Sequence, residues 1–496
     1  MIERRNTHVL DVDRHDVATT LKRHLVDGYR VAMVSGAEDD DRFRVIYVLV
    51  RPVDDQRVEL VLEVAKDQPS IPSLAAVNYP VGRFEREIRD LYGITPEDHP
   101  LPYRLIRHGH WPQGWYAMRR DADPAPRFDP DVGSFPFLEV EGEGVYEIPV
   151  GPVHAGLIEP GHFRFSVVGE TILRMKARLW FVHRGIEKLF EGRRPAEAIE
   201  LAERISGDTA VGHALAFAMA VEDAAGIAVT EKDRCVRALL LELERLHNHI
   251  ADIGALANDV GFGLANAHAQ RLRESLLRLN KATTGHRLLR GGITIGGAGL
   301  TALPDLDTIR SVAREVEDLA ALVLANSTVR DRFTGTAVLT GEAAEGVGAL
   351  GYVARASGID IDARRDHPYL DLGAAFAVVL EQNGDVLSRF HVRVQEAAVS
   401  AALIDDLSAR LGTSTGTRQD VASSGPGAGL SLVEGWRGTI AHRVELDAAG
   451  TLSRVKVVDP SFYNWPALPL ALADTIVPDF PLANKSFNQS YAGNDL

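Results

Sequence analysis

An apolar stripe in residues 236–253 places the strongest constraint on the fold. Because an α-helix turns once in 3.6 residues, apolar side chains spaced three and four apart lie on one face. That spacing predicts a long helix with a buried side, and residues 306–324 predict a second one in the same way. A helical core is therefore expected here. The stripe consists of Val236, Leu239, Leu240, Leu243, Leu246, Ile250 and Ile253.

Length and composition indicate a soluble protein of two or more domains. The chain has 496 residues, of which 45% are hydrophobic, as is ordinary for a protein with a large core. Its formal net charge is −15 and it has no long basic stripe, so nucleic acid is not an expected partner. Neither a signal peptide nor an apolar run long enough to span a bilayer is seen.

The single cysteine, Cys235, limits the redox chemistry open to this chain. One thiol excludes a disulfide within the chain and fits a reducing cytosol. It also excludes an iron–sulfur cluster held by this chain's own cysteines. A small residue packed under a helix is a better interpretation of Cys235 than a reactive thiol.

The N-terminal part, residues 1–120, is predicted to form a small α+β domain. Residues 44–50 and 58–64 are rich in β-branched side chains and predict strands, and residues 84–92 predict a short charged helix. Residues 121–135 are rich in proline and aspartate, which is typical of a linker.

Residues 136–496 are predicted to form a larger, mainly helical domain with peripheral strands. A hairpin is expected first, with strands at 137–140 and 145–150 around a glycine-rich turn. A loop is expected at 412–429 and a late strand at 454–458. The fold class predicted for the whole chain is α+β.

Polar side chains suggest two places for chemistry. His154 and His162 flank a turn rich in glycine and proline, where binding sites tend to lie, although the residues alone favour two exposed loop histidines. Residues 170–192 predict a helix that places His183 and Glu187 on one face. Burial would raise the pKa of Glu187 and suit it to proton relay, whereas a solvated His–Glu pair is the simpler alternative.

Residues 79–94 read Tyr-Pro-Val-Gly-Arg-Phe-Glu-Arg-Glu-Ile-Arg-Asp-Leu-Tyr-Gly-Ile, and His99-Pro100 follows. This string resembles the 30 kDa subunit of respiratory complex I. Residues 148–496 resemble the 49 kDa subunit of complex I and the large subunit of group 4, energy-converting [NiFe] hydrogenases. Both modules in one chain are typical of formate hydrogenlyase-type large subunits. The second resemblance extends to residues 355–358, 362–364, 367–369, 454–456 and 460–462.

The hydrogenase pattern is changed where its metal-binding cysteines belong. Residues 204–209 read Arg-Ile-Ser-Gly-Asp-Thr in place of Arg-x-Cys-Gly-x-Cys, and residues 486–495 resemble a terminal Asp-Pro-Cys-x-x-Cys without cysteine. A nickel–iron centre needs soft thiolates, which hydroxyls and glycine cannot replace. The resemblance therefore implies a chain that binds no metal itself. The four changed positions are Ser206, Thr209, Ser490 and Gly493.

The same resemblance implies roles for further residues. Residues 183–188 match the hydrogenase Arg-Gly-x-Glu motif, whose glutamate transfers protons, which implies that role for Glu187. His213 falls where a histidine follows the first cysteine pair of the hydrogenases.

Quinone contacts are implied by the likeness to complex I. His162 falls near the histidine that binds the quinone headgroup, and Asp259 resembles the acid that pairs with it. Gly207 stands at the place of the tyrosine that completes that site, so one of its two donors is missing.

We therefore expect a peripheral subunit on the cytoplasmic face of the membrane, in an energy-converting oxidoreductase complex. The expected partners are an iron–sulfur small subunit like the complex I 20 kDa subunit and antiporter-like membrane subunits. The iron–sulfur clusters would lie in partner subunits, and a quinone is a candidate ligand. Two alternatives stay open: a structural scaffold that docks the iron–sulfur subunit, and a true formate hydrogenlyase or hydrogenase large subunit.

Overall fold

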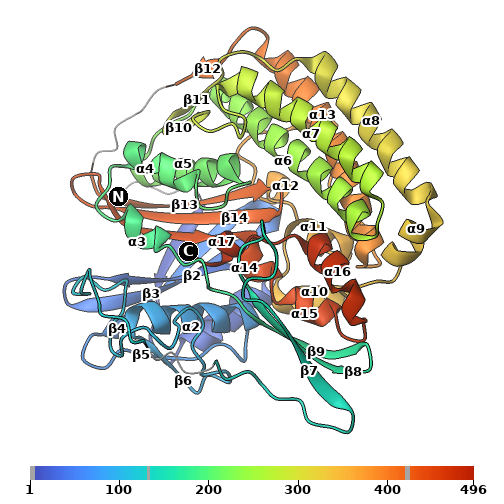
Figure 1. Ribbon diagram of the computed structural model, residues 1–496. Coiled ribbons are helices and arrows are strands. Elements are labelled where there is room, and N and C mark those ends of the chain that lie inside the picture. Colours follow the sequence, from blue (N-terminus) through green and yellow to red (C-terminus); the bar gives the residue numbers. More distant parts are fainter. Residues whose placement is uncertain (1–5, 131–134, 419–424) are drawn as a thin grey trace.

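The computed structural model describes residues 6–130, 135–418 and 425–496 (Figure 1). Its N-terminal part contains a four-stranded sheet in the order β1-β4-β3-β2, in which only β1 and β4 run parallel. The predicted strands at 44–50 and 58–64 are confirmed as the central parts of β3 and β4. The strands are β1 (Thr7–Asp11), β2 (Arg30–Glu38), β3 (Arg42–Arg51) and β4 (Gln56–Ala65).

Helix α2 (Tyr79–Tyr92) packs against β2 and confirms the helix predicted at 84–92. It begins earlier than predicted, because the Asn78 side chain accepts the Val81 N–H at 3.2 Å and Pro80 occupies the first turn. Gly93 ends it with a φ of 75°, in the left-handed region. The other elements of this part are α1 (Val17–Val26), β5 (Ser70–Pro72) and β6 (Thr95–Glu97).

The hairpin predicted from strands 137–140 and 145–150 is wrong. Strand β7 (Val145–Val150) pairs instead with β8 (His162–Val168). The three inward side chains of β8 are fully buried, whereas Leu138 is 49% exposed, so β8 contributes far more apolar surface to the core. Those three side chains are Phe163, Phe165 and Val167.

The helix predicted at 170–192 is also wrong. Residues in its first half form strand β9 (Thr171–Arg178), which pairs antiparallel with β8, and only α3 (Ile186–Phe190) is helical. Pairing with β8 overrides the local helical pattern, because the ladder bonds the backbone groups on one side of β9 and the strand buries Ile172 and Met175. As a result, His183 and Glu187 do not share a helix face.

Four long helices form a bundle beside the sheets (Figure 1). Helix α6 packs against α7 and α13, and α8 packs against α7 and α13. The two helices predicted from apolar spacing are confirmed as α6 and α8. No helix in the described ranges is both long enough and apolar enough to cross a membrane. The bundle comprises α6 (Glu231–Asp259), α7 (Gly263–Thr284), α8 (Leu306–Ala325) and α13 (Val386–Leu411).

An antiparallel sheet of β13 (Gly427–Gly435), β14 (Gly438–Leu446) and β15 (Leu452–Val458) occupies the middle of the molecule. Helix α5 (Ala210–Ala225) packs against β13 and β14, and the N-terminal sheet lies on the other side (Figure 1). β15 confirms the strand predicted at 454–458. The loop predicted at 412–429 contains the short β12 (Gly416–Thr417), and its last three residues begin β13; residues 419–424 lie outside the described part.

One buried and one half-buried ion pair tie this sheet to the N-terminal part. Arg443 on β14 pairs with Glu59 on β4 at 3.0 Å, and Arg44 on β3 pairs with Glu445 on β14 at 2.9 Å. Charged groups removed from water cost several kcal/mol unless they are paired, so these contacts fix how the two parts meet. Whether residues 1–120, 121–135 and 136–496 are the boundaries of the domains stays a prediction.

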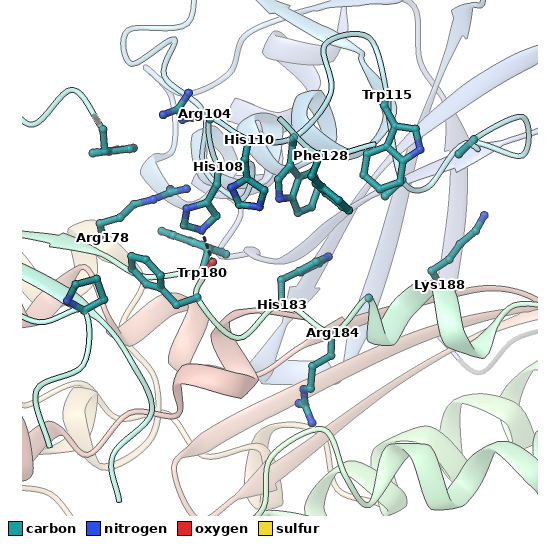
Figure 2. Close-up of a pocket in the computed structure, with 18 of the residues that line it drawn as sticks. Arg104, His108, His110, Trp115, Phe128, Arg178, Trp180, His183, Arg184 and Lys188 are labelled. Atoms are coloured by element: carbon teal, nitrogen blue, oxygen red, sulfur yellow. Dashed lines mark hydrogen bonds between the residues drawn. The ribbon is translucent and has the colours of Figure 1, made fainter. Parts of the chain in front are cut away.

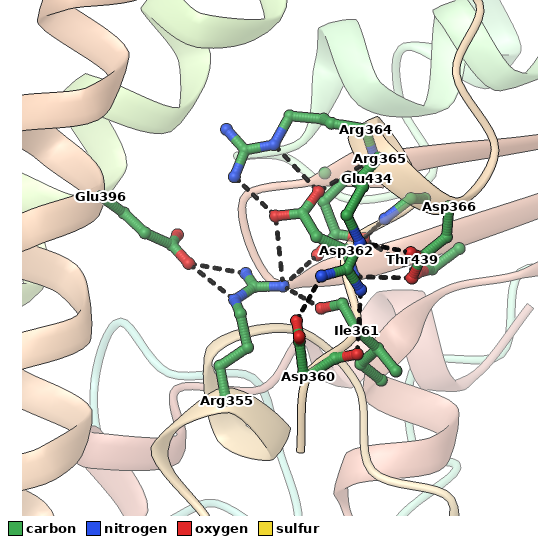
Figure 3. A network of polar contacts seen from close by, with 12 residues as sticks. Arg355, Asp360, Ile361, Asp362, Arg364, Arg365, Asp366, Glu396, Glu434 and Thr439 are labelled. Atoms are coloured by element: carbon green, nitrogen blue, oxygen red, sulfur yellow. Dashed lines mark hydrogen bonds and ion pairs between the residues drawn. The ribbon is translucent and has the colours of Figure 1, made fainter. Parts of the chain in front are cut away.

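A second network of buried charges holds the bundle to the central sheet (Figure 3). Arg355 in α11 (Gly351–Ala356) contacts Glu396 on α13 at 2.7 Å and Glu434 on β13 at 2.8 Å. Arg364 in α12 (Ala363–Asp366) pairs with Asp362 at 2.7 Å. Two of the motifs noted in the sequence thus serve the packing of the core.

The last residues of the chain fold back into the interior. The C-terminus lies near α3 and α17 (Figure 1), and Leu496 is 9% exposed. The helices that bring it there are α14 (Pro460–Asn464), α15 (Ala467–Ala471), α16 (Phe480–Phe487) and α17 (Tyr491–Asn494). The short elements between the bundle helices are β10 (Ile293–Thr294), β11 (Gly297–Gly299), α9 (Ser327–Phe333) and α10 (Gly341–Val347).

Candidate functional site

The two changed cysteine motifs meet at a buried point between α5 and α17. Ser206 precedes α5, and its Oγ lies 2.9 Å from the Oγ of Ser490, which comes 284 residues later. Ser490 is the N-cap of α17 and accepts the Gly493 N–H at 2.9 Å. The two serines are therefore occupied by hydrogen bonds to each other and to the backbone, as caps and buried hydroxyls usually are.

Thr209 faces an ion pair next to this point. Its Oγ1 donates to the Asp208 carboxylate at 3.2 Å and accepts the Trp436 indole N–H at 3.1 Å. Arg437 holds Asp208 with two hydrogen bonds of 2.7 Å. Burial alone would raise the pKa of Asp208, but the guanidinium of Arg437 outweighs it and lowers the pKa to about 2. The carboxylate therefore stays ionised.

Gly493 lies against a buried aspartate–histidine pair. A Cβ added at Gly493 would lie 2.6 to 2.9 Å from the three carboxyl atoms of Asp459. Asp459 contacts His213 Nε2 at 3.0 Å, and His213 Nδ1 lies 3.1 Å from His442 Nε2. His213, which the resemblance singled out, thus supports the carboxylate that occupies the space beside Gly493.

These residues do not fit a nickel–iron centre. Two of the four positions carry serine hydroxyls that are hydrogen-bonded to each other. The third carries a threonine hydroxyl that is hydrogen-bonded to Asp208 and Trp436. At the fourth, Gly493, there is no room for a side chain. Neutral hydroxyls are poor ligands for soft metals. Among the described residues, no three His, Cys, Asp or Glu side chains are arranged to hold a metal ion.

Glu187 is buried, so the simpler alternative of a solvated His–Glu pair does not hold, but its pKa does not rise as burial alone would make it. Arg454 on β15 donates to its Oε2 at 2.7 Å, and Lys456 lies 3.0 Å from its Oε1. Burial favours the neutral acid, yet these two cations outweigh it and lower the pKa of Glu187 to about 2. The expectation of a raised pKa is wrong, because β15 supplies the two cations.

A cavity of about 980 Å³ lies between residues 104–128 and the segment 178–189 (Figure 2). Arginine, lysine and histidine side chains share its wall with aromatic rings, and among the described residues Asp123 is the single carboxylate on it. His183 joins the cavity to the changed motifs, since its Nδ1 contacts the Asp495 carboxylate at 3.1 Å. Such a wall suits a planar ligand with hydrogen-bond acceptors. Its aromatic residues are Trp111, Trp115, Phe128, Phe135, Trp180 and Phe181.

His162 lies on the wall of this cavity, whereas Asp259 does not. His162 Nε2 is buried without a hydrogen-bond partner in the described residues, and burial lowers the pKa of the ring. Asp259 ends α6, where burial raises its pKa and Lys485 opposes the shift. No hydrogen bond or ion pair joins the two within the described ranges, so the structure does not bring this predicted pair into contact. Gly207 has open space where a side chain would project.

Sequence reasoning missed several residues of the site. Arg437 and Asp459 come from β-strand ends more than 200 residues away from Asp208 and His213, as the separations of 229 and 246 residues show. No motif was noted around Arg437, and Asp459 lies between the noted segments 454–456 and 460–462 without being singled out. The cavity residues Arg178 and Trp180 were missed because their segment was predicted to be helical.

Comparison with known families supports the resemblance found in the sequence. Residues 8–127 match the respiratory-chain NADH dehydrogenase 30 Kd subunit, and residues 259–424 match the 49 Kd subunit of the same enzyme. Residues 184–257 match the nickel-dependent hydrogenase family. The predicted likeness to complex I and to hydrogenases is therefore confirmed.

Individual proteins match over most of the chain. Formate hydrogenlyase subunit 5 of Escherichia coli (strain K12) is 32% identical over 447 residues, covering 88% of this chain and 78% of the relative. Hydrogenase-4 component G of the same strain is 32% identical over 421 residues, covering 83% of this chain and 73% of the relative. The chain therefore corresponds to most of each relative.

Among solved structures, a chain of the archaeal membrane-bound sulfane sulfur reductase, a respiratory membrane complex, aligns with a TM-score of 0.65 at 25% identity. The alignment covers 71% of this chain and 99% of that chain. The mixed α+β fold is thus shared with a chain of an archaeal respiratory membrane complex. The chain belongs to the formate hydrogenlyase subunit 5 family of complex I-related large subunits.

Proposed function

We propose that the chain is the large subunit of a membrane-associated, energy-converting oxidoreductase complex and carries no nickel–iron centre of its own. The closed contact between Ser206 and Ser490, together with Asp459 beside Gly493, carries this proposal. Family membership supports the setting, and the donor chemistry of the site argues against hydrogen activation at nickel.

We further propose where the subunit lies and which subunits it contacts. The subunit would lie on the cytoplasmic face of the membrane and contact an iron–sulfur small subunit and antiporter-like membrane subunits. Clusters in those partners would carry the electrons. Residues 1–120 and 136–496 would act as the 30 kDa-like and 49 kDa-like domains, joined by the linker 121–135. The relatives' membership of membrane complexes supports this assignment.

Metal analysis of the native complex tests the first part. The complex is purified from its own host, and nickel and iron are measured per copy of this chain. We expect iron from partner clusters and no nickel above background, because Ser206, Thr209, Ser490 and Gly493 supply no thiolate. Stoichiometric nickel would overturn the proposal and support a true hydrogenase subunit. A preparation that contains the chain without redox partners would contradict the complex itself.

We also propose that the cavity of Figure 2 accepts a quinone-like molecule. Quinone carbonyls are acceptors, and the cavity wall offers buried N–H groups that lack partners within the described residues: Arg104 Nε, Arg178 Nε and Trp180 Nε1. His162 Nε2 adds a fourth group with an unused hydrogen-bonding position. In this arrangement the N–H groups of the two arginines and of the Trp180 indole would donate to the quinone, whereas Asp259 makes no contact with it.

Replacing His162 by alanine is expected to weaken binding of a short-chain quinone by about tenfold, the equivalent of roughly 1.4 kcal/mol for one lost hydrogen bond. Titration of the purified complex with the quinone measures the Kd. His154→Ala is the matched control, because His154 lies on the same turn but contacts Tyr491 Oη at 3.3 Å and is not part of the cavity wall. Equal affinity in both variants would refute the quinone site and favour the scaffold.

A further inference from the structure

A buried cluster of two carboxylates and two cations joins α2, α3 and β15. Glu87 comes from α2, Glu187 from α3, and Arg454 and Lys456 from β15. Lys456 Nζ lies 2.7 Å from Glu87 Oε1 and 3.0 Å from Glu187 Oε1, so one ammonium group pairs with both carboxylates. The cluster lies where the N-terminal part meets the central sheet.

The two carboxylates are held unequally. Glu187 receives hydrogen bonds on both oxygens, from Arg454 at 2.7 Å, from Lys456, and from the Val457 N–H at 3.1 Å. Glu87 has Lys456 on Oε1, while its Oε2 is buried and has no hydrogen-bond partner in the described part of the chain. A buried ionised carboxylate without donors on one oxygen is costly, and a proton on that oxygen lowers the cost, because a neutral acid is cheaper to bury than a charged one.

We propose that Glu87 is a buried proton-binding site at the junction of α2, α3 and β15, and that Glu187 stays ionised while Glu87 gains and loses its proton. Burial raises the pKa of Glu87 and the charge of Glu187 adds to the shift, while Lys456 opposes it. The proton would sit on Oε2, the oxygen that Lys456 does not contact. When Glu87 is neutral, Lys456 pairs with Glu187 alone.

The other charged groups around Glu87 do not change this assignment. Arg454 makes its carboxylate contact with Glu187, and Arg83, one helical turn away on α2, donates to the Phe462 carbonyl. Both cations act on Glu87 through space only and, like Lys456, favour its ionised form. The inference goes beyond the proposed function and does not depend on it, since it concerns proton binding within this chain.

Infrared difference titration of the full-length chain tests the proposal. We expect a protonated-carboxyl band that disappears as the pH rises in the wild type and is absent from Glu87→Gln. In Glu187→Gln the same band should disappear at a lower pH. The negative charge of Glu187 is then gone and Lys456 pairs with Glu87 alone, so both changes favour the ionised form of Glu87. A spectrum unchanged by Glu87→Gln, or a band lost in Glu187→Gln instead, would overturn the proposal.

Glu85→Gln provides the matched control on the same helix. Glu85 is buried with a pKa raised to about 7 by burial, but its two oxygens accept the Leu74 N–H at 2.6 Å and the Ser73 hydroxyl at 2.7 Å. Its band should be lost in Glu85→Gln and should not move in Glu187→Gln. Movement of both bands by the same amount would mean a general structural change and would refute the specific site.

Thermal unfolding as a function of pH gives an independent measurement. A carboxyl with a raised folded-state pKa stabilises the fold below its ordinary pKa, and that contribution is lost as the pH rises through the folded-state pKa. The wild-type midpoint should therefore fall over this range relative to that of Glu87→Gln. Parallel curves for the two proteins contradict the proposal. If Glu87→Gln does not fold, the wild-type band and its shift in Glu187→Gln decide the question.

Discussion

Methionine in place of Arg355 is expected to lower the free energy of unfolding by about 3–5 kcal/mol, the range for breaking a buried ion pair from one side. Arg355 is fully buried and contacts Glu396 at 2.7 Å and Glu434 at 2.8 Å (Figure 3). Methionine fills much of the volume but leaves two buried carboxylates short of a cation. Denaturant unfolding of the full-length chain measures the loss.

Arg310→Met is the control for this experiment. Arg310 also forms a two-point contact with a carboxylate, Asp405, at 3.0 Å for each bond, but its side chain is 50% exposed. Water already solvates both charges there, so we expect a loss of about 0–1 kcal/mol. If the two substitutions cost the same, burial does not set the strength of the Arg355 network.

Cysteine at position 493 is expected to destabilise the chain by about 1–3 kcal/mol, the usual cost of overfilling a packed site. The new Cβ would lie 2.6 Å from the Asp459 Cγ, so Asp459 must shift, which disturbs its contact with His213. Thermal or denaturant unfolding measures the loss. Restoring all four cysteines should accordingly give no nickel binding, which metal analysis of the purified variant checks.

Gly207→Cys is the matched control, because a Cβ added at Gly207 meets no atom within 4 Å. It should leave the free energy of unfolding nearly unchanged. The double variant Gly493→Cys with Asp459→Ala should lose less than the sum of the two single losses, since the clash is removed with the carboxylate. Additive losses would show that the clash does not cause the instability.

Local patterns in the sequence predicted the elements that bury an apolar face. The stripe that begins at Val236 gave α6 correctly, because helical spacing and burial require the same side chains. The segment 170–192 failed, since pairing with β8 decides the conformation of β9 and no local pattern reveals that partner. The expected pKa of Glu187 failed for the same reason: its cations lie 267 and 269 residues away on β15.

The candidate site was predictable only where a family motif marked it. The motifs led to Ser206 and Ser490, which the structure brings within 2.9 Å of each other. Arg437 and His442 come from the turn and strand that follow β13, and their roles depend on where the sheet meets α5. A pairing with Asp259 was predicted for His162 by analogy, and the cavity wall around His162 contains other donors instead.

The ion pairs between the N-terminal part and the central sheet also bear on the order in which the chain can mature on the ribosome. Arg443, which pairs with Glu59, is synthesised 384 residues after it. Lys456, which pairs with Glu87, is synthesised 369 residues after it. Domains emerge and fold from the N-terminus during synthesis. The nascent N-terminal part must therefore keep these acids hydrated, or protonated, until the last strands are made. Final docking is thus a late event in translation, and a ribosome that stops before residue 443 releases a chain that lacks the strand residues Arg443 and Lys456.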